Sequence, residues 1–446
     1  MKKLALLLTV CLLAWSALAG CQTQETPQPP EPSGYEASAS STAQEGDPVV
    51  LCIEDSFEQD AYELENYLKA TGVETEYEFL VLPNNTEDRE TELTRLRTEI
   101  MAGEGPDAFI LNATIPGYVT DLSTMAPTEA LFPNVEKSMY SHLFLDVEEM
   151  VQNSETIDLA NCNPTVMDVG VTSGGRFLLP LTYTFSVHIF DTAHLNDPNF
   201  TFTSLEELLQ SDEESLKGTL AWGSFRLFPD CLDPLVDYEG QNLLVTREAM
   251  QQAVEQADAL VDLQDESYSE SPLVYQSGTG ISMYSLLGLS SEDTEYTFFP
   301  VPNRNGGVTA AVTFYAAINA NAAHPQEAFD FIELLYSEEL FTEQGFEVNG
   351  FHYGTTFSYG NHGGLSVSIP VKDEIFFQYL ESYDILPGTM ASLRKAVERI
   401  DSAKVYSDLD LAIYQMYNTW RYDRPEETLE ELVDRTVSTM EMTLAE

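Results

Sequence analysis

Apolar residues in the first part of the globular chain repeat with two different periods, which predicts strands and helices in turn. Val49 to Ile53 is a short apolar run typical of a buried strand, and Glu76 to Leu82 alternates apolar with polar residues. Asp60 to Ala70 and Thr86 to Met101 instead carry apolar residues at helical spacing, and Asp107 to Leu111 is again a buried run. This β-α-β-α-β order predicts a parallel sheet that helices cover.

The middle of the chain contains a long apolar run from Phe177 to Phe190, interrupted by Pro180, which we interpret as a crossing between two lobes. Thr203 to Glu206 has the sequence Thr-Ser-Leu-Glu, a capping box that predicts the start of a short helix. The C-terminal part of the chain is expected to be mostly helical. Further expected elements are strands at Leu220 to Trp222, Tyr296 to Val301 and Val308 to Asn319, and helices at Thr246 to Leu263, Glu327 to Tyr336 and Pro425 to Leu444.

The N-terminus has the features of a lipoprotein signal peptide. Two lysines precede the apolar run Leu4 to Leu18, which at about 15 residues is shorter than the roughly 20 that cross a bilayer. Leu18 to Cys21 has the sequence Leu-Ala-Gly-Cys, a lipobox whose cysteine would receive the lipid. The alternative is an ordinary secretion signal with a chance cysteine. We expect a signal peptide at residues 1–20, lipidation of Cys21, and a disordered tether at residues 21–47, rich in Pro, Ser and Thr.

The charge balance limits the classes of partner. The 446 residues include 74 Asp and Glu against 20 Lys and Arg, which gives a formal net charge of −54. Nucleic acids and anionic lipid surfaces are excluded as partners, because both are bound by clustered basic residues. An acidic surface favours cationic ligands, although solubility outside the cell is the simpler explanation. About 400 residues follow the tether, which is too many for a single core and predicts two domains.

The sequence lacks the motifs of the common catalytic and metal sites. It contains neither G-x-S-x-G nor H-E-x-x-H, its histidines have no metal spacing, and no cofactor is expected. Ser392 to Lys395 matches S-x-x-K, but the match lies within an amphipathic helix and no K-T-G accompanies it. Cys52, Cys162 and Cys231 cannot all pair, and Cys52 is expected to be a small buried residue of a strand. We therefore predict that the chain is not an enzyme.

Three stretches match the motifs of a known family in order and spacing. Gly103 to Phe109 is a Gly-x-Gly-Pro-Asp turn into a strand, and Gly175 to Leu181 is a Gly-basic-aromatic-apolar-apolar-Pro segment. The third stretch combines an apolar-Pro-x-Pro strand at Phe299 to Pro302, an Ile-Asn strand at Ala317 to Ala320, and a Pro-x-Glu-Ala helix at His324 to Ile332. The chain thereby resembles bacterial extracellular solute-binding proteins of the maltose-binding type, the family 1 substrate-binding lipoproteins of ABC transporters.

The resemblance covers roughly residues 48–340, with a later match at Ser368 to Val371. It implies an α/β, two-lobed periplasmic-binding-protein-like fold (type II), whose discontinuous lobes are joined by hinge strands and close around a ligand. It also implies a monomer, lipid-anchored at the extracytoplasmic face of the cell membrane, that delivers its ligand to an ABC permease. The expected division is residues 48–183 and 302–350 for lobe 1, and residues 184–301 and 351–446 for lobe 2.

Two departures from the family pattern leave the ligand open. The family's Tyr-Asn-Lys after the crossover strand is replaced by His188 to Thr192, and its Thr-Trp-x-Glu is replaced by Phe202 to Glu206. A sugar or oligosaccharide is the leading class of small-molecule ligand, with peptides, polyamines and other solutes still open. An extracellular lipoprotein hydrolase with an unrecognised site and a surface adhesion lipoprotein are the alternative functions.

Candidate ligand-binding residues follow from the rule that ligands sit beyond the carboxyl ends of parallel strands. Asp55 and Phe57 follow the first strand, and Asn112, Thr114 and Tyr118 follow the third. Loop solvation is the alternative role for residues of this kind, and core packing is the alternative for the aromatic residues of the crossing strands. Further candidates are Tyr183 and Phe185 at the crossover, Trp222 as a stacking ring, Phe314 and Tyr315 in the returning strand, and Arg304 as a scarce cation for a ligand carboxylate or a neighbouring acid.

Overall fold

The computed structural model describes most of the chain beyond its N-terminal segment, and Ser41–Glu446 is one compact unit. The described residues are 47–113, 129–218, 220, 230–263, 276–277, 286, 289, 293–341, 345–353, 369–381, 383–423 and 426–445. Within these ranges, no helix has the length and apolar character that would let it span a membrane.

The first elements form a parallel sheet with connecting helices, as the hydrophobic periodicity predicts. β1 (Val49–Glu54) pairs in parallel with β2 (Tyr77–Leu82) on one side and with β3 (Ala108–Asn112) on the other. The connections are α2 (Glu58–Thr71) and α3 (Thr86–Met101), and α3 has the predicted bounds. The predicted βαβαβ unit is therefore confirmed.

Local sequence determines where these helices begin and end. α2 ends at Gly72, whose φ of 91° lies in the left-handed region that glycine adopts without a Cβ clash. α3 begins after Asn85, whose side chain accepts a hydrogen bond from a backbone N–H of the first helical turn. α7 (Leu205–Gln210) begins after Ser204, which is its N-cap. The predicted capping box is thus wrong by one residue, because Thr203 precedes the cap instead of forming it.

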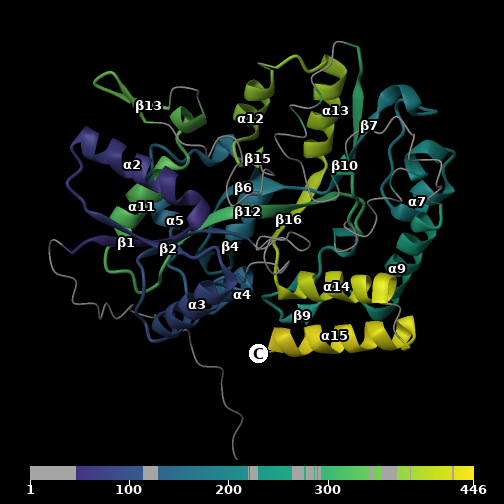
Figure 1. Cartoon of the computed structure of the whole chain (residues 1–446), viewed down its shortest axis with the longest axis horizontal. Coiled ribbons are helices and arrows are strands. Elements are labelled where there is room, and N and C mark those ends of the chain that lie inside the picture. Colours follow the sequence, from purple (N-terminus) through teal and green to yellow (C-terminus); the bar gives the residue numbers. More distant parts are fainter. Residues whose placement is uncertain are drawn as a thin grey trace, which may run out of the picture. The chain divides into compact units, whose positions relative to one another are not determined.

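Further strands extend the sheet. β12 (Val308–Ile318) is buried along its whole length and lies antiparallel to β3 and to β6 (Leu179–Thr184). β15 (Ile369–Pro370) pairs with β6, and β16 (Ile400–Val405) pairs in parallel with β12. The order is β15-β6-β12-β3-β1-β2, with β16 also beside β12 (Figure 1). β16 interrupts a C-terminal region that the sequence predicts to be mostly helical.

The apolar run from Phe177 to Phe190 forms strands in two different sheets. β6 belongs to the large sheet, whereas β7 (Val187–Asp191) pairs antiparallel with β11 (Tyr296–Pro300) and with β10 (Gln276–Ser277) in a second sheet. The chain therefore passes from one sheet to the other before β7 and returns after β11. This is the crossing that the run predicts, while the exact lobe boundaries remain a prediction.

The remaining elements cover the sheets or form short hairpins (Figure 1). The helices are α4 (Val135–Tyr140), α5 (Glu148–Asn153), α6 (Pro164–Met167), α9 (Arg247–Val261), α11 (Pro325–Leu334), α12 (Asp373–Leu380), α13 (Pro387–Glu398), α14 (Asp408–Asn418) and α15 (Leu429–Ala445). The short strands are β4 (Val171–Thr172), β5 (Gly175–Arg176), β8 (Val236–Asp237), β9 (Asn242–Leu243), β13 (Phe346–Val348) and β14 (Phe351–Tyr353). Single 3-10 turns relevant to the site are η1 (Asp55–Phe57), η3 (Asp168–Gly170) and η5 (Asp230–Leu232).

Separate apolar clusters fill the interior. The largest surrounds the long sheet and includes Phe109 and Phe314. A second lies among α9, α14 and α15 and includes Met250 and Tyr417. A third packs β7 and β11 against α7 and includes Phe190. Burial of such large side chains is the main favourable contribution to the folded state.

Two further sequence predictions can be compared with the structure. Cys52, Cys162 and Cys231 are all free thiols, and Cys52 is buried in β1 as predicted. Leu220 is helical, so the strand expected to begin at this residue is wrong at its first position. The rest of that expected strand lies outside the described residues.

Candidate functional site

The carboxyl ends of β1 and β3 meet as predicted. Asn112 donates from Nδ2 to Ser56 Oγ at 3.3 Å, which joins the end of β3 to η1. Asp55, the first residue of η1, is exposed. Behind it, the buried carboxylate of Glu54 accepts from Arg89 at 2.9 and 3.1 Å and is therefore neutralised by an ion pair. The structure thus brings Asp55 and Asn112 to one edge of the sheet.

Five of the predicted aromatic candidates, from η1 and from the crossing strands, lie in the core. Phe57 has no exposed surface, and its ring meets the Phe314 ring edge-on with centroids 5.4 Å apart. Tyr183 is buried and donates from its hydroxyl to Asp373 Oδ1 at 2.6 Å. Phe185 and Tyr315 are each only 1% exposed. The observed role of these five rings is packing, and any contact with a solute stays a prediction.

Within the described part of the chain, Arg304 binds backbone carbonyls and forms no ion pair with an acid. Its guanidinium donates to the carbonyl oxygens of Leu244 at 2.5 Å and Pro234 at 2.7 Å, although the side chain is exposed. Arg304 therefore holds the two segments that flank the β8–β9 hairpin. Thr114, Tyr118, Trp222 and Cys21 lie outside the described residues.

A cavity of about 430 Å³ lies where β16 meets α4, η3 and β8. A smaller cavity of about 80 Å³ adjoins it and shares part of its lining. Carboxylates and phenol rings dominate the polar lining of the larger cavity, and among its described lining residues there is no Lys, Arg or His. The carboxylates are Glu136, Asp168, Asp237 and Asp401, and the phenols are Tyr140 and Tyr238.

Local structure explains how these acids reach the cavity. Asn134 caps α4, so that Glu136 falls in the first turn of that helix. Asp168 opens η3 directly after the short helix α6. Asp237 accepts from the Gly240 N–H at 2.9 Å within the turn of the β8–β9 hairpin. The acids therefore come from separate parts of the chain, each held by its own turn.

Asp401 comes from the strand β16, where its position is tied to β12. Its Oδ1 accepts from Asn303 Nδ2 at 2.8 Å and from the Val308 N–H at 3.1 Å. These bonds attach the cavity wall to the start of the strand that returns to the large sheet. The wall of the cavity is thus hydrogen-bonded to the segment that returns from the second sheet.

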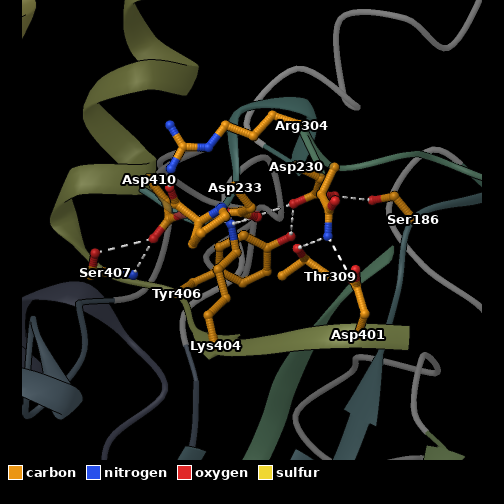
Figure 2. A network of polar contacts seen from close by, with 12 residues as sticks. Ser186, Asp230, Asp233, Arg304, Thr309, Asp401, Lys404, Tyr406, Ser407 and Asp410 are labelled. Atoms are coloured by element: carbon orange, nitrogen blue, oxygen red, sulfur yellow. Dashed lines mark hydrogen bonds and ion pairs between the residues drawn. The ribbon is translucent and has the colours of Figure 1, made fainter. Parts of the chain in front are cut away.

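A buried network centred on Lys404 lies beside the cavity (Figure 2). Lys404 Nζ is 2.6 Å from Asp233 Oδ2, 2.7 Å from Asp410 Oδ1 and 3.5 Å from Asp230 Oδ1. It also lies 4.7 Å from the centre of the Tyr406 ring. Three carboxylates, from η5, the residue after it and α14, therefore surround one ammonium from β16, and the negative charges outnumber the positive charge.

The network extends to the crossing strands. Asp230 accepts from the Tyr406 hydroxyl at 3.0 Å and from Ser186, which lies between β6 and β7 (Figure 2). Ser407 forms a capping box with Asp410 at the start of α14. A single set of polar contacts thus connects η5, β16 and α14 to the point where the chain leaves the large sheet.

Burial changes the acidity of two carboxyl groups here. Burial raises the pKa of Asp233 to about 8, although nearby Lys404 opposes the rise. Burial also raises the pKa of Glu136 to about 8, and the neighbouring charge of Asp410 adds to the effect. Glu136 is therefore largely protonated at neutral pH and would ionise if a cation came close.

Sequence reasoning missed the cavity and its network. Lys404 and Asp401 lie on the strand β16, whose partner β12 is far away in the sequence. The available signal was a lysine within an alternating Ile-Asp-Ser-Ala-Lys-Val run in a chain poor in cations. No periodicity links Glu136, Asp168 and Asp237, because they meet only through tertiary packing.

No family model matches the sequence, and no curated protein matches it. Solved structures do match. The sugar-binding protein MalE from the phytopathogen Xanthomonas citri has a TM-score of 0.57 at 12% identity, over 90% of this chain and 98% of that chain. An extracellular solute-binding protein family 1 from Alicyclobacillus acidocaldarius has a TM-score of 0.52 at 15% identity, over 90% and 100%.

A periplasmic oligogalacturonide binding protein from Yersinia enterocolitica has a TM-score of 0.52 at 15% identity, over 89% of this chain and 99% of that chain. At such identities the likeness concerns the fold. The α/β periplasmic-binding-protein-like fold expected from the sequence is therefore confirmed.

Proposed function

We propose that this chain is the solute-capturing subunit of an ABC importer, lipid-anchored through Cys21 at the extracytoplasmic face of the cell membrane. The observation that carries the proposal is the cavity of about 430 Å³ at the crossing between two sheets, in a fold shared with solute-binding proteins. Its volume lies within the roughly 300–1,000 Å³ typical of small-molecule sites. The lipobox at Leu18 to Cys21 supports the anchor.

The proposed lobes both contribute to the wall of this cavity. Glu136, Tyr140 and Asp168 belong to the expected lobe 1, and Tyr238 and Asp401 belong to the expected lobe 2. A ligand that touched both sets of side chains would favour the closed arrangement of the lobes over the open one. Closure around the ligand would then present it to the permease, and no chemical step is required of the protein.

A carbohydrate is our first choice of ligand class. Carboxylates accept hydrogen bonds from sugar hydroxyls, and the rings of Tyr140 and Tyr238 offer faces for the apolar side of a pyranose. The names of two structural neighbours refer to sugar and to oligogalacturonide binding, which agrees with this choice. Asp55 and Asn112 remain proposed contacts at the sheet edge, together with Thr114, Tyr118 and Trp222.

Thermal unfolding of the purified full chain would test the proposal. A panel of neutral, acidic and amino sugars, short peptides and polyamines would be added one at a time. A ligand at a hundred times its Kd stabilises the native state by about 2.7 kcal/mol, which is easily measured. A selective rise in Tm with one class supports solute capture, whereas flat curves across the panel or catalytic turnover of a probe would contradict it.

A further inference from the structure

The cavity has a one-sided charge. Its described lining carries four carboxylates and no basic side chain. The oligogalacturonide named for one structural neighbour is an acidic sugar, and such a ligand would meet repulsion from Asp168, Asp237 and Asp401. The charge of the lining therefore selects against anionic solutes and for neutral or cationic ones.

Three basic groups around the cavity are already engaged. Lys404 is held by Asp233 and Asp410 at 2.6 and 2.7 Å. Lys137, next to Glu136 in α4, donates instead to the carbonyl oxygens at the C-terminal end of α15, at 3.1 and 3.3 Å. Arg304 is occupied by two backbone carbonyls. None of these three cations is left to balance the carboxylates of the lining.

The adjoining Lys404 network adds to the imbalance. Asp230, Asp233 and Asp410 are at most 4% exposed and share one ammonium group. The small cavity of about 80 Å³ that Asp233 and Asp410 line also reaches Glu136. Burial raises the pKa values of Glu136 and Asp233 to about 8, and neighbouring acids add to both shifts. A bound cation would favour the ionised form of Glu136.

The shape of the lining favours an organic cation over a metal ion. Among the described residues, no group of three or more His, Cys, Asp or Glu is arranged to hold a metal. The carboxylates instead line a cavity large enough for a small molecule, next to the rings of Tyr140 and Tyr238. Phenol rings attract ammonium groups through cation–π interaction, and their faces also pack against carbon chains or sugar rings.

We propose that the solute captured in this cavity carries at least one protonated primary amine, held by Glu136 and Asp168 beside the tyrosine rings. The inference rests on the proposed function and narrows its ligand class. An amino sugar and a linear polyamine share this chemistry. An amino sugar also satisfies the hydroxyl-binding role described above, whereas a polyamine would use the carboxylates alone.

Isothermal titration of the full chain at about 150 mM salt distinguishes these ligands, because screening suppresses the general attraction of cations to an acidic surface. The probes are a chitosan trisaccharide, spermidine, neutral maltotriose and Mg²⁺. One or both amines are expected to bind with one-site stoichiometry. The amine that binds shows whether the solute is an amino sugar or a linear polyamine. Maltotriose and Mg²⁺ are expected to give no comparable heat.

A pair of double variants separates the cavity from the rest of the acidic surface. E136Q with D168N removes two carboxyl groups that would be ionised in the complex, and is expected to weaken amine binding about tenfold for each of them. E90Q with E149Q removes the same charge at exposed positions outside the cavity and is expected to leave binding unchanged. The Tm of each unliganded variant verifies that both proteins are folded.

Several results would overturn the inference. If maltotriose binds and the amines do not, the amine class is wrong while the proposed solute capture stands. If Mg²⁺ reproduces the amine signal, or the exposed pair E90Q with E149Q weakens it as much as the cavity pair, the attraction is non-specific and the site is wrong. If no probe binds, both the inference and the proposed carbohydrate capture fail.

Discussion

The Nζ atom of Lys404 lies 2.6 Å from Oδ2 of Asp233, and both residues are almost completely buried. Asp410 accepts from the same ammonium at 2.7 Å. Asp233 directly follows η5 and is 171 residues away from Lys404 of β16, so this contact joins parts of the chain that are distant in sequence. The network is therefore both a structural junction and the negatively charged neighbour of the candidate solute cavity.

Replacement of Lys404 by methionine should strongly destabilise the fold. K404M leaves buried carboxylates without their cation, and the loss of one partner of a buried ion pair costs about 3–5 kcal/mol. The matched variant K395M removes an exposed lysine of α13 and should change the free energy of unfolding by only about 0.5 kcal/mol. Urea denaturation of both variants provides the measurement. Equal, small effects would show that Lys404 does not hold the network together.

Replacement of Asp233 by asparagine should flatten the pH dependence of stability. The pKa of Asp233 is raised from 3.8 to about 8 in the native state, chiefly by burial. The native state therefore holds more protons than the unfolded state between about pH 4 and 8, and the unfolding free energy falls as pH rises through that window. D233N removes this contribution and leaves that of Glu136, whose pKa is also raised.

Tm measured from pH 5 to 8.5 would test whether stability falls as pH rises. The wild type should lose Tm across the window more steeply than D233N, while the exposed variant D262N should follow the wild type. A wild-type Tm that rises steadily toward pH 8 with the same slope as D233N would show that Asp233 does not retain a proton in the native state.

The buried pair Glu54–Arg89 provides a comparison with a surface pair on the same helix. Arg89 donates to both carboxylate oxygens of Glu54, at 2.9 and 3.1 Å, and to the Glu129 carbonyl at 2.7 Å. R89M should cost about 3–5 kcal/mol, because it leaves the Glu54 charge buried and unpaired. R95M removes a side chain that is 45% exposed and should cost at most about 1 kcal/mol. Chemical denaturation that gave equal costs would contradict the assigned roles.

Elements with local periodicity could be predicted from the sequence, whereas the site could not. The βαβαβ unit follows from apolar spacing within each segment, and α3 has its predicted bounds because Asn85 caps it locally. β16 was missed, because a six-residue strand with alternating small and polar residues is stabilised by its distant partner β12 and not by its own pattern. Phe57 was expected near a ligand because it follows β1, but η1 turns its ring onto Phe314.

The candidate cavity illustrates the same limit at the level of function. Glu136, Asp168, Asp237 and Asp401 are four of 74 acidic residues, and nothing in the sequence distinguishes them from the others. Their meeting depends on how α4, η3, the β8–β9 hairpin and β16 pack together. The edge formed by Asp55 and Asn112 could be predicted, because parallel strands bring their carboxyl ends together by topology alone.

Amine binding in the cavity should release protons. Glu136 lies near Lys404 of β16, Asp233 after η5 and Asp410 of α14, and its pKa is raised to about 8, chiefly by burial. An ammonium group beside Glu136 favours the ionised carboxylate and lowers that pKa, so the proton held at pH 7 is expelled on binding. The affinity for spermidine, whose primary amines stay protonated over this range, should therefore increase from pH 6 to 8.

Titrations at pH 7 in phosphate and in Tris would measure this release, because the two buffers differ in their enthalpy of protonation. The observed binding enthalpy should differ between them in proportion to the protons released, and the difference should decrease in E136Q. D237N, which removes a different carboxylate of the same lining, should retain the difference even if its affinity falls. Equal enthalpies in both buffers for the wild type would mean that Glu136 is already ionised in the free protein, and that the lining does not lack a positive charge.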